Sequence, residues 1–176
     1  RGMSSAASDV YKRQAIGYEA LKQNTTGYRG VAIGRGALDS NTEGHNNVGV
    51  GYLALASNLT SGDNTAIGTQ ALSISTGASN TAIGYKAGDA NMTGLQNVVI
   101  GATADASVAN AQNQIVIGYA ATGTGNNEIA LGNTSISAIK AQVNSITAYS
   151  DRRIKREIND SKLGLDFIMN LRPVTY

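Results

Sequence analysis

The residues best suited to chemistry lie together near residue 150, where a glycine-rich chain becomes basic. Residues 150–155 read SDRRIK, so a serine hydroxyl, a carboxylate and several cations share one short segment. A serine attacks an amide only when a base takes its proton, and a lysine serves as that base if burial or neighbouring cations lower its pKa. Ser150 and Lys155 are the candidates. The competing interpretation is a solvated helix start, because residues five apart do not share a helix face.

Composition divides the chain at the same point. Residues 1–149 contain 20 of the 21 glycines, whereas residues 150–176 carry six Lys or Arg against four Asp or Glu. The chain has no Trp, and its one Phe, Phe167, lies outside the glycine-rich part. That part cannot fill a thick globular core, so we expect thin repeated layers and association with further copies. It has no basic stripe for nucleic acid and no segment near the roughly 20 apolar residues that span a bilayer. We therefore expect neither nucleic-acid binding nor membrane insertion.

A period of about 17 residues governs residues 15–132. An aliphatic residue followed by glycine recurs there, with alanine four residues after the aliphatic position and asparagine three residues before it in four repeats. The aliphatic positions are Ile16, Ile33, Val50, Ile67, Ile83, Ile100, Ile117 and Leu131. Short β-branched runs bounded by Gly, Asn and Thr are typical of strands. We predict an all-β fold, a repetitive parallel β-roll or β-helix with one coil of about 17 residues per repeat.

The repeat also predicts what each position does. We expect the Ile-Gly and Ala-Leu positions to be the two apolar anchors of a coil, and the asparagines to form an amide ladder along the axis. Glycines of the preceding turn would supply a positive φ; they are Gly27, Gly44, Gly62, Gly77, Gly94 and Gly125. Tyrosines follow Ile-Gly in alternate repeats and either pack at an edge or act at the surface; they are Tyr18, Tyr52, Tyr85 and Tyr119. Because two anchors per coil leave one flank uncovered, three parallel copies are the economical assembly.

Two other repeat folds fit the pattern less well. Hexapeptide β-helices of acyltransferases need three aliphatic anchors per coil rather than two, and calcium-binding nonapeptide rolls need a GGxGxD run that does not occur. His45, the single histidine, has no acidic or serine partner at a recognisable spacing and is expected to be a turn residue. We expect no cofactor and no metal site.

The segments outside the repeats have a different pattern. Residues 1–14 do not follow the period and are expected to be a non-native or unstructured leader. Residues 133–149 alternate apolar and polar side chains, which predicts a strand-like stalk or connector. In residues 150–176, apolar residues at helical spacing predict one helix, with Ser161 as its N-cap and Pro173 at its end.

The repeat resembles those of phage tail-fibre proteins and of trimeric autotransporter adhesin heads. The residues that carry this resemblance are SGDNTAIGTQALSIS at 61–75 and TGASNTAIGYKAGDAN at 76–91. It covers residues 15–132 and implies a trimeric parallel β-roll.

Residues 150–176 are similar to the opening of the intramolecular chaperone domain of endosialidase-type tail spikes. The matching residues are Ser150, Asp151, Arg153, Ile154, Lys155, Ile158, Leu165, Ile168, Leu171, Arg172, Pro173, Val174 and Tyr176. The resemblance implies a domain that drives trimerisation and then cleaves between Tyr149 and Ser150, with Ser150 and Lys155 as the catalytic dyad and Asp151 in support. Because the match stops at Tyr176, we expect a truncated α+β stub that is inactive, with self-cleavage confined to the intact parent protein.

These observations favour a structural homotrimeric fibre carrying the start of a self-cleaving chaperone. Its location would be a virion tail fibre or a bacterial cell surface, hence extracellular. The alternative is an adhesin head that binds a host surface, through a receptor or a glycan, without proteolysis. In both cases the first partner is the chain itself.

Overall fold

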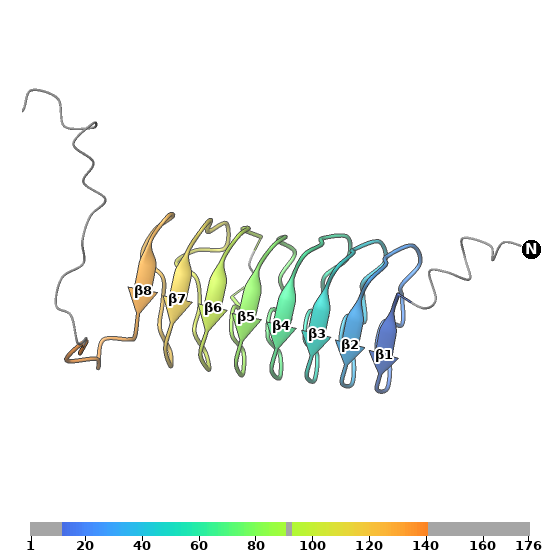
Figure 1. Ribbon diagram of the computed structural model, residues 1–176, viewed down its shortest axis with the longest axis horizontal. Coiled ribbons are helices and arrows are strands. Elements are labelled where there is room, and N and C mark those ends of the chain that lie inside the picture. Colours follow the sequence, from blue (N-terminus) through green and yellow to red (C-terminus); the bar gives the residue numbers. More distant parts are fainter. Residues whose placement is uncertain (1–11, 91–92, 141–176) are drawn as a thin grey trace, which may run out of the picture. The chain divides into compact units, whose positions relative to one another are not determined.

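The structure, a computed structural model, describes residues 12–90 and 93–140, and this part of the chain is a parallel β-solenoid. It contains eight strands of three residues and no helix. The strands are β1 (Gln14–Ile16), β2 (Val31–Ile33), β3 (Val48–Val50), β4 (Thr65–Ile67), β5 (Thr81–Ile83), β6 (Val98–Ile100), β7 (Ile115–Ile117) and β8 (Ile129–Leu131). Figure 1 shows them side by side in chain order, each joined to the next by one coil of backbone. The predicted all-β solenoid with coils of about 17 residues is confirmed, with about seven turns.

Successive coils stack in register. Every strand pairs in parallel with the next, so that Val48 of β3 lies opposite Thr65 of β4. Hydrogen bonds between coils continue beyond the strands; the Leu38 N–H donates to the Ala54 carbonyl at 2.9 Å, and the Leu55 N–H donates to the Ala71 carbonyl at 3.1 Å. The coil itself therefore serves as the long crossover that parallel strands need, and each position of the repeat becomes a column along the axis.

Two columns of apolar side chains fill the interior of the solenoid. The middle residue of each strand points inward, as Ala32, Ala66 and Val99 do, and the Ala-Leu positions line the next side of the coil. All these alanines and leucines from coil two to coil four are fully buried: Ala37, Leu38, Ala54, Leu55, Ala71 and Leu72. The Ala-Leu anchor is therefore confirmed.

The predicted Ile-Gly anchor is wrong. Alternate residues of a strand point to opposite faces, so when the central alanine faces the interior, the isoleucine beside it faces outward. Ile67 and Ile83 are 40% and 38% exposed, whereas Ala66 and Ala82 between the outward positions are fully buried. The inner cavity of such a coil accepts alanine or valine at this place, and the larger isoleucines lie outside it.

A column of buried amides runs beside the apolar columns, and it confirms the predicted ladder. Asn80 donates its backbone N–H to Asn64 Oδ1 at 2.9 Å, and Asn97 donates its own to Asn80 Oδ1 at 3.0 Å. The Asn80 side chain also donates from Nδ2 to the Gly94 carbonyl at 2.9 Å. The column continues to Gln114, whose backbone N–H donates to Asn97 Oδ1 at 3.0 Å. Each rung thus satisfies a backbone group of the next, which removes the cost of burying an unpaired amide.

The turn glycines have a different role from the predicted one. None of the six has a positive φ; instead, a Cβ at Gly77 would collide with the Gly94 carbonyl of the next coil. Their small size lets neighbouring coils approach closely. Positive φ occurs at the glycine after the strand, such as Gly34 (φ 125°), and at non-glycine residues such as Leu38 and Leu55 (both φ 53°).

The ends of the described chain differ in part from the expected boundaries. β1 begins at Gln14, and Arg13 donates from a guanidinium nitrogen to Asn24 Oδ1 at 2.8 Å. Residues 133–140, the described part of the expected stalk, form a turn and irregular chain without a strand. The rest of the stalk, the expected helix and most of the expected leader lie outside the described residues.

Truncating one rung of the amide column should destabilise the solenoid. In Asn80→Ala, the Asn97 N–H and the Gly94 carbonyl lose their buried partner, and we expect the free energy of unfolding to fall by roughly 2–4 kcal/mol in urea denaturation. The matched control is Asn110→Ala, at an exposed asparagine, which should change it little. Equal effects of both substitutions would contradict a structural role for the column.

Candidate functional site

The outward face of the sheet carries two columns of mainly aliphatic side chains, here called the aliphatic face. It consists of the first and third residues of each strand: Gln14, Val31, Val48, Thr65, Thr81, Val98, Ile115 and Ile129 in one column, and Ile16, Ile33, Val50, Ile67, Ile83, Ile100, Ile117 and Leu131 in the other. All are exposed or half-buried, and none is charged. An apolar surface that follows the whole length of a sheet is typical of a protein interface.

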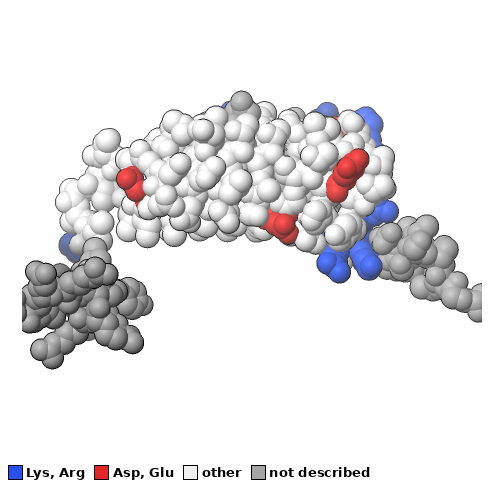
Figure 2. Space-filling view, turned by 90° about the horizontal axis from the view of Figure 1, so that it is seen from above, with Lys and Arg blue, Asp and Glu red and all other residues white. Residues whose placement is uncertain are grey.

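Charge is sparse and uneven along the described solenoid. Five cations lie in residues 12–35, but Lys86 is the single Lys or Arg in residues 36–139. The same stretch holds six Asp or Glu residues. Figure 2 shows a largely uncharged surface, with basic side chains gathered toward the β1 end. The aliphatic face therefore has no charged residues of its own that would oppose close approach of another copy.

A row of exposed tyrosines lies just beyond the glycine that follows every second strand, β1, β3, β5 and β7. This tyrosine row consists of Tyr18, Tyr52, Tyr85 and Tyr119, which are 68%, 42%, 51% and 71% exposed. The Arg35 guanidinium lies between the first two rings, 5.8 Å from the centroid of each, and Lys86 Nζ lies 5.8 Å from that of Tyr85. Such distances are typical of cation–π contacts. These exposures fit both sequence interpretations of the tyrosines, packing at a half-exposed edge and a role at the surface.

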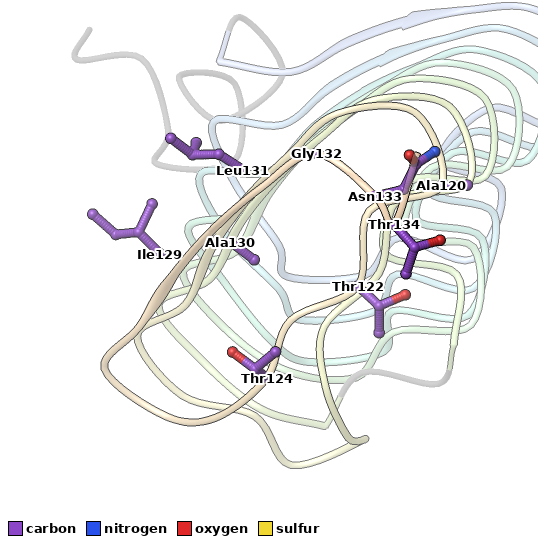
Figure 3. A pocket seen from close by; sticks show the side chains of 9 residues that line it. All are labelled: Ala120, Thr122, Thr124, Ile129, Ala130, Leu131, Gly132, Asn133 and Thr134. Carbon is purple, nitrogen blue, oxygen red and sulfur yellow. The ribbon is translucent and has the colours of Figure 1, made fainter. Parts of the chain in front are cut away.

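Hollows occur at the two ends of the described solenoid. One, of about 460 Å³, lies at the β8 coil and is lined by Ala120, Thr122, Thr124 and residues 129–134. Figure 3 shows Ala130 pointing into the coil, whereas Ile129 and Leu131 point away from it. The other lies at the β1 coil, against Ala15, Ala20 and Leu21. Each hollow is the open end of the coil interior, which no further described coil covers. The hollow at β8 is lined by threonines, but its lining holds no base that could activate a threonine hydroxyl.

Two carboxylates approach each other on neighbouring coils. Burial raises the pKa of Asp105, hydrogen bonds from the Ala90 and Ala106 backbones oppose that rise, and the charge of Asp89 adds to it. Asp89 in turn accepts a short hydrogen bond from the Ser73 hydroxyl. Among the described residues no group of three or more His, Cys, Asp or Glu side chains could hold a metal ion. The charge of Asp89 thus disfavours the ionised form of Asp105.

The residues with predicted chemistry, Tyr149, Ser150, Asp151 and Lys155, lie outside the described residues. The expected turn residue His45 is described: its ring stacks on Tyr28 with centroids 5.1 Å apart and planes 8° from parallel. Sequence reasoning missed this stack and the aliphatic face. The signal for the stack was the separation of Tyr28 and His45 by 17 residues, one full period.

The comparisons with known proteins are negative. No family model matches the chain, and neither a curated protein nor a solved structure is similar to it. Within the described part of the chain, no helix has the length and apolar character required to cross a membrane.

Removing the buried charge at Asp105 should stabilise the fold at neutral pH. Because its pKa is raised above the ordinary 3.8, the folded chain binds this proton more tightly than the unfolded chain, and the group contributes less stability as the pH rises above 3.8. Asp105→Asn should therefore raise Tm at pH 7, and the gain should shrink as the pH falls below 3.8. The exposed Asp63→Asn is the control. A gain that is equal at pH 7 and pH 3 would contradict this origin.

Proposed function

We propose that the chain is a structural segment of a homotrimeric fibre, in which three parallel copies place their aliphatic faces against a shared long axis. The observation that supports this most strongly is the uncharged aliphatic face along β1–β8, which the single chain leaves open to water. Burying such columns contributes about 25 cal/mol for each Å² of apolar surface removed from water. A parallel arrangement about the axis brings equivalent columns together along their whole length.

The number three rests on the resemblance of the repeat to trimeric β-rolls. Closed symmetry satisfies every copy equally, because a heterologous contact that does not close would lead to an open polymer. The work of such a segment is mechanical: it extends the fibre and displays whatever lies at its ends.

The proposal includes a chaperone in the intact parent protein. Residues 150–176 support it through their resemblance to the self-cleaving domain of tail spikes. In that assignment Ser150 is the nucleophile, Lys155 is its base, and scission falls between Tyr149 and Ser150. If the cleavage site were strained only in the complete trimer, cleavage would report on correct assembly. The proposed location is a virion tail fibre or a bacterial cell surface.

An adhesin head without proteolysis is the second candidate. Two exposed aromatic features favour it, the tyrosine row and the stacked pair Tyr28 and His45, because exposed aromatic side chains are common at binding surfaces. The same trimer would then serve as a ligand-binding surface for a host receptor or glycan.

Charge on the aliphatic face should break the assembly. We expect the unmodified chain to have three times its 18.1 kDa mass in light scattering, and Ile67→Glu combined with Ile83→Glu to reduce that mass, since charges would be buried at the axis. Both side chains point away from the interior, so the coil itself should stay folded by circular dichroism. Thr76→Glu, at an exposed position off the aliphatic face, is the matched control. A folded monomer before substitution would contradict the proposal.

Self-cleavage should depend on the serine and lysine. In a chain that continues through the complete chaperone domain, intact-mass spectrometry should find a fragment that ends at Tyr149. Ser150→Ala and Lys155→Met should each abolish the fragment, because one removes the nucleophile and the other its base. Cleavage that persists in Ser150→Ala would rule out this dyad, whereas no cleavage in the unmodified complete chain would favour the adhesin candidate.

A further inference from the structure

We propose that the tyrosine row binds an extended, acidic polysaccharide with β-1,4 linkages. The inference goes beyond the proposed fibre function and depends on it in one respect, since the row must stay exposed when the fibre assembles. It rests on the spacing, the exposure and the charged neighbours of four rings that the repeat places on one side of the solenoid.

The spacing of the rings matches an extended sugar chain. The tyrosines occupy alternate coils, and neighbouring strands are about 4.8 Å apart, so successive rings of the row are about 9.5 Å apart along the axis. In an extended β-1,4-linked polysaccharide each sugar is turned over relative to the last, so every second sugar presents the same face. The length of two such sugars is close to this spacing, and each ring can therefore stack on every second sugar.

The chemistry of the rings suits the face of a sugar. A tyrosine ring has a negative face, which attracts the polarised C–H groups on the flat side of a pyranose, while its hydroxyl can donate to or accept from sugar hydroxyls. Tyrosine also loses little conformational entropy on binding, because it has only two side-chain torsions. All four rings are between 42% and 71% exposed, so part of each ring is open to contact with a ligand.

The cations beside the row favour an acidic ligand. Arg35 lies between Tyr18 and Tyr52, and Lys86, the single cation of residues 36–139, lies over Tyr85. Glu19 next to Tyr18 forms an ion pair with Lys22 at 2.7 Å, so its charge is balanced. Three of the four rings thus have a cation beside them, and guanidinium and ammonium groups can pair with carboxylates between the stacked sugars.

The row is also distinct from the aliphatic face. A glycine with a positive φ separates each ring from the last residue of its strand, for example Gly51 (φ 136°) before Tyr52. The chain changes direction at this glycine, so the ring and the outward isoleucine of the same coil belong to different columns. Assembly through the aliphatic face and ligand binding at the row can therefore coexist.

Binding to a mannuronate octamer, which is acidic and β-1,4-linked, tests the proposal. Isothermal titration calorimetry of the full chain at low salt should detect binding, and Tyr52→Ala combined with Tyr85→Ala should weaken it by about tenfold or more. Leu59→Ala, at an exposed apolar residue outside the row, is the matched control. Arg35→Gln should weaken binding of the mannuronate octamer more than binding of the neutral cello-octaose. Added salt should likewise weaken binding of the charged octamer more, because it screens the charges.

The outcomes separate this inference from the fibre proposal. It is overturned if the mannuronate octamer does not bind, if neutral cello-octaose or α-linked malto-octaose binds equally well, or if the row variants bind like the unmodified chain. It is also overturned if Tyr52→Ala with Tyr85→Ala dissociates the trimer in light scattering, because the row would then be part of the interface. An unmodified chain that is monomeric but binds the octamer would contradict the fibre proposal and leave this inference standing.

Discussion

In-register stacking of successive coils is the constraint on which the rest of the structure depends. Each coil forms the same hydrogen bonds with the next coil, so every position of the 17-residue period becomes a column along the axis. A residue type that packs badly at one position would therefore pack badly in every coil. The buried columns are accordingly small or self-complementary. Alanine and leucine fill the interior, and the Asn47 to Gln114 column satisfies the backbone that it buries. At turn glycines such as Gly77 and Gly94, a Cβ would collide with the backbone of the next coil.

The same constraint creates the outer surface. A three-residue strand with its middle side chain inside must present its first and third side chains outside, and here those are mainly valine, isoleucine and threonine. The coil thus satisfies its own interior but leaves an uncharged apolar strip along one side. In the proposed fibre, association covers this strip rather than completing the core, which refines the expectation from composition that the coils are too thin to stand alone.

The period was sufficient to predict the coil length, the parallel architecture and the amide column, because each follows from spacing alone. Spacing did not reveal which strand residue faces inward. In the strand TAI (β4), the isoleucine is the most apolar residue, yet the alanine is the one that faces the interior. The reason is the narrow interior of the coil, and its width depends on the whole turn rather than on the strand alone. The turn glycines were misjudged because positive φ and close packing select the same residue type. The predicted Ser150 and Lys155 site rests on resemblance and lies outside the described residues.

Cross-linking at a single introduced cysteine tests the shared-axis arrangement most directly, since the chain has no cysteine of its own. Thr81→Cys places a thiol of similar size on the aliphatic face, and Thr60→Cys places one on an exposed turn away from it. With a short trifunctional maleimide, we expect Thr81→Cys to yield a covalent trimer on a denaturing gel and Thr60→Cys to yield only monomer. Monomer alone from Thr81→Cys at a concentration where the fold is intact would contradict the central claim.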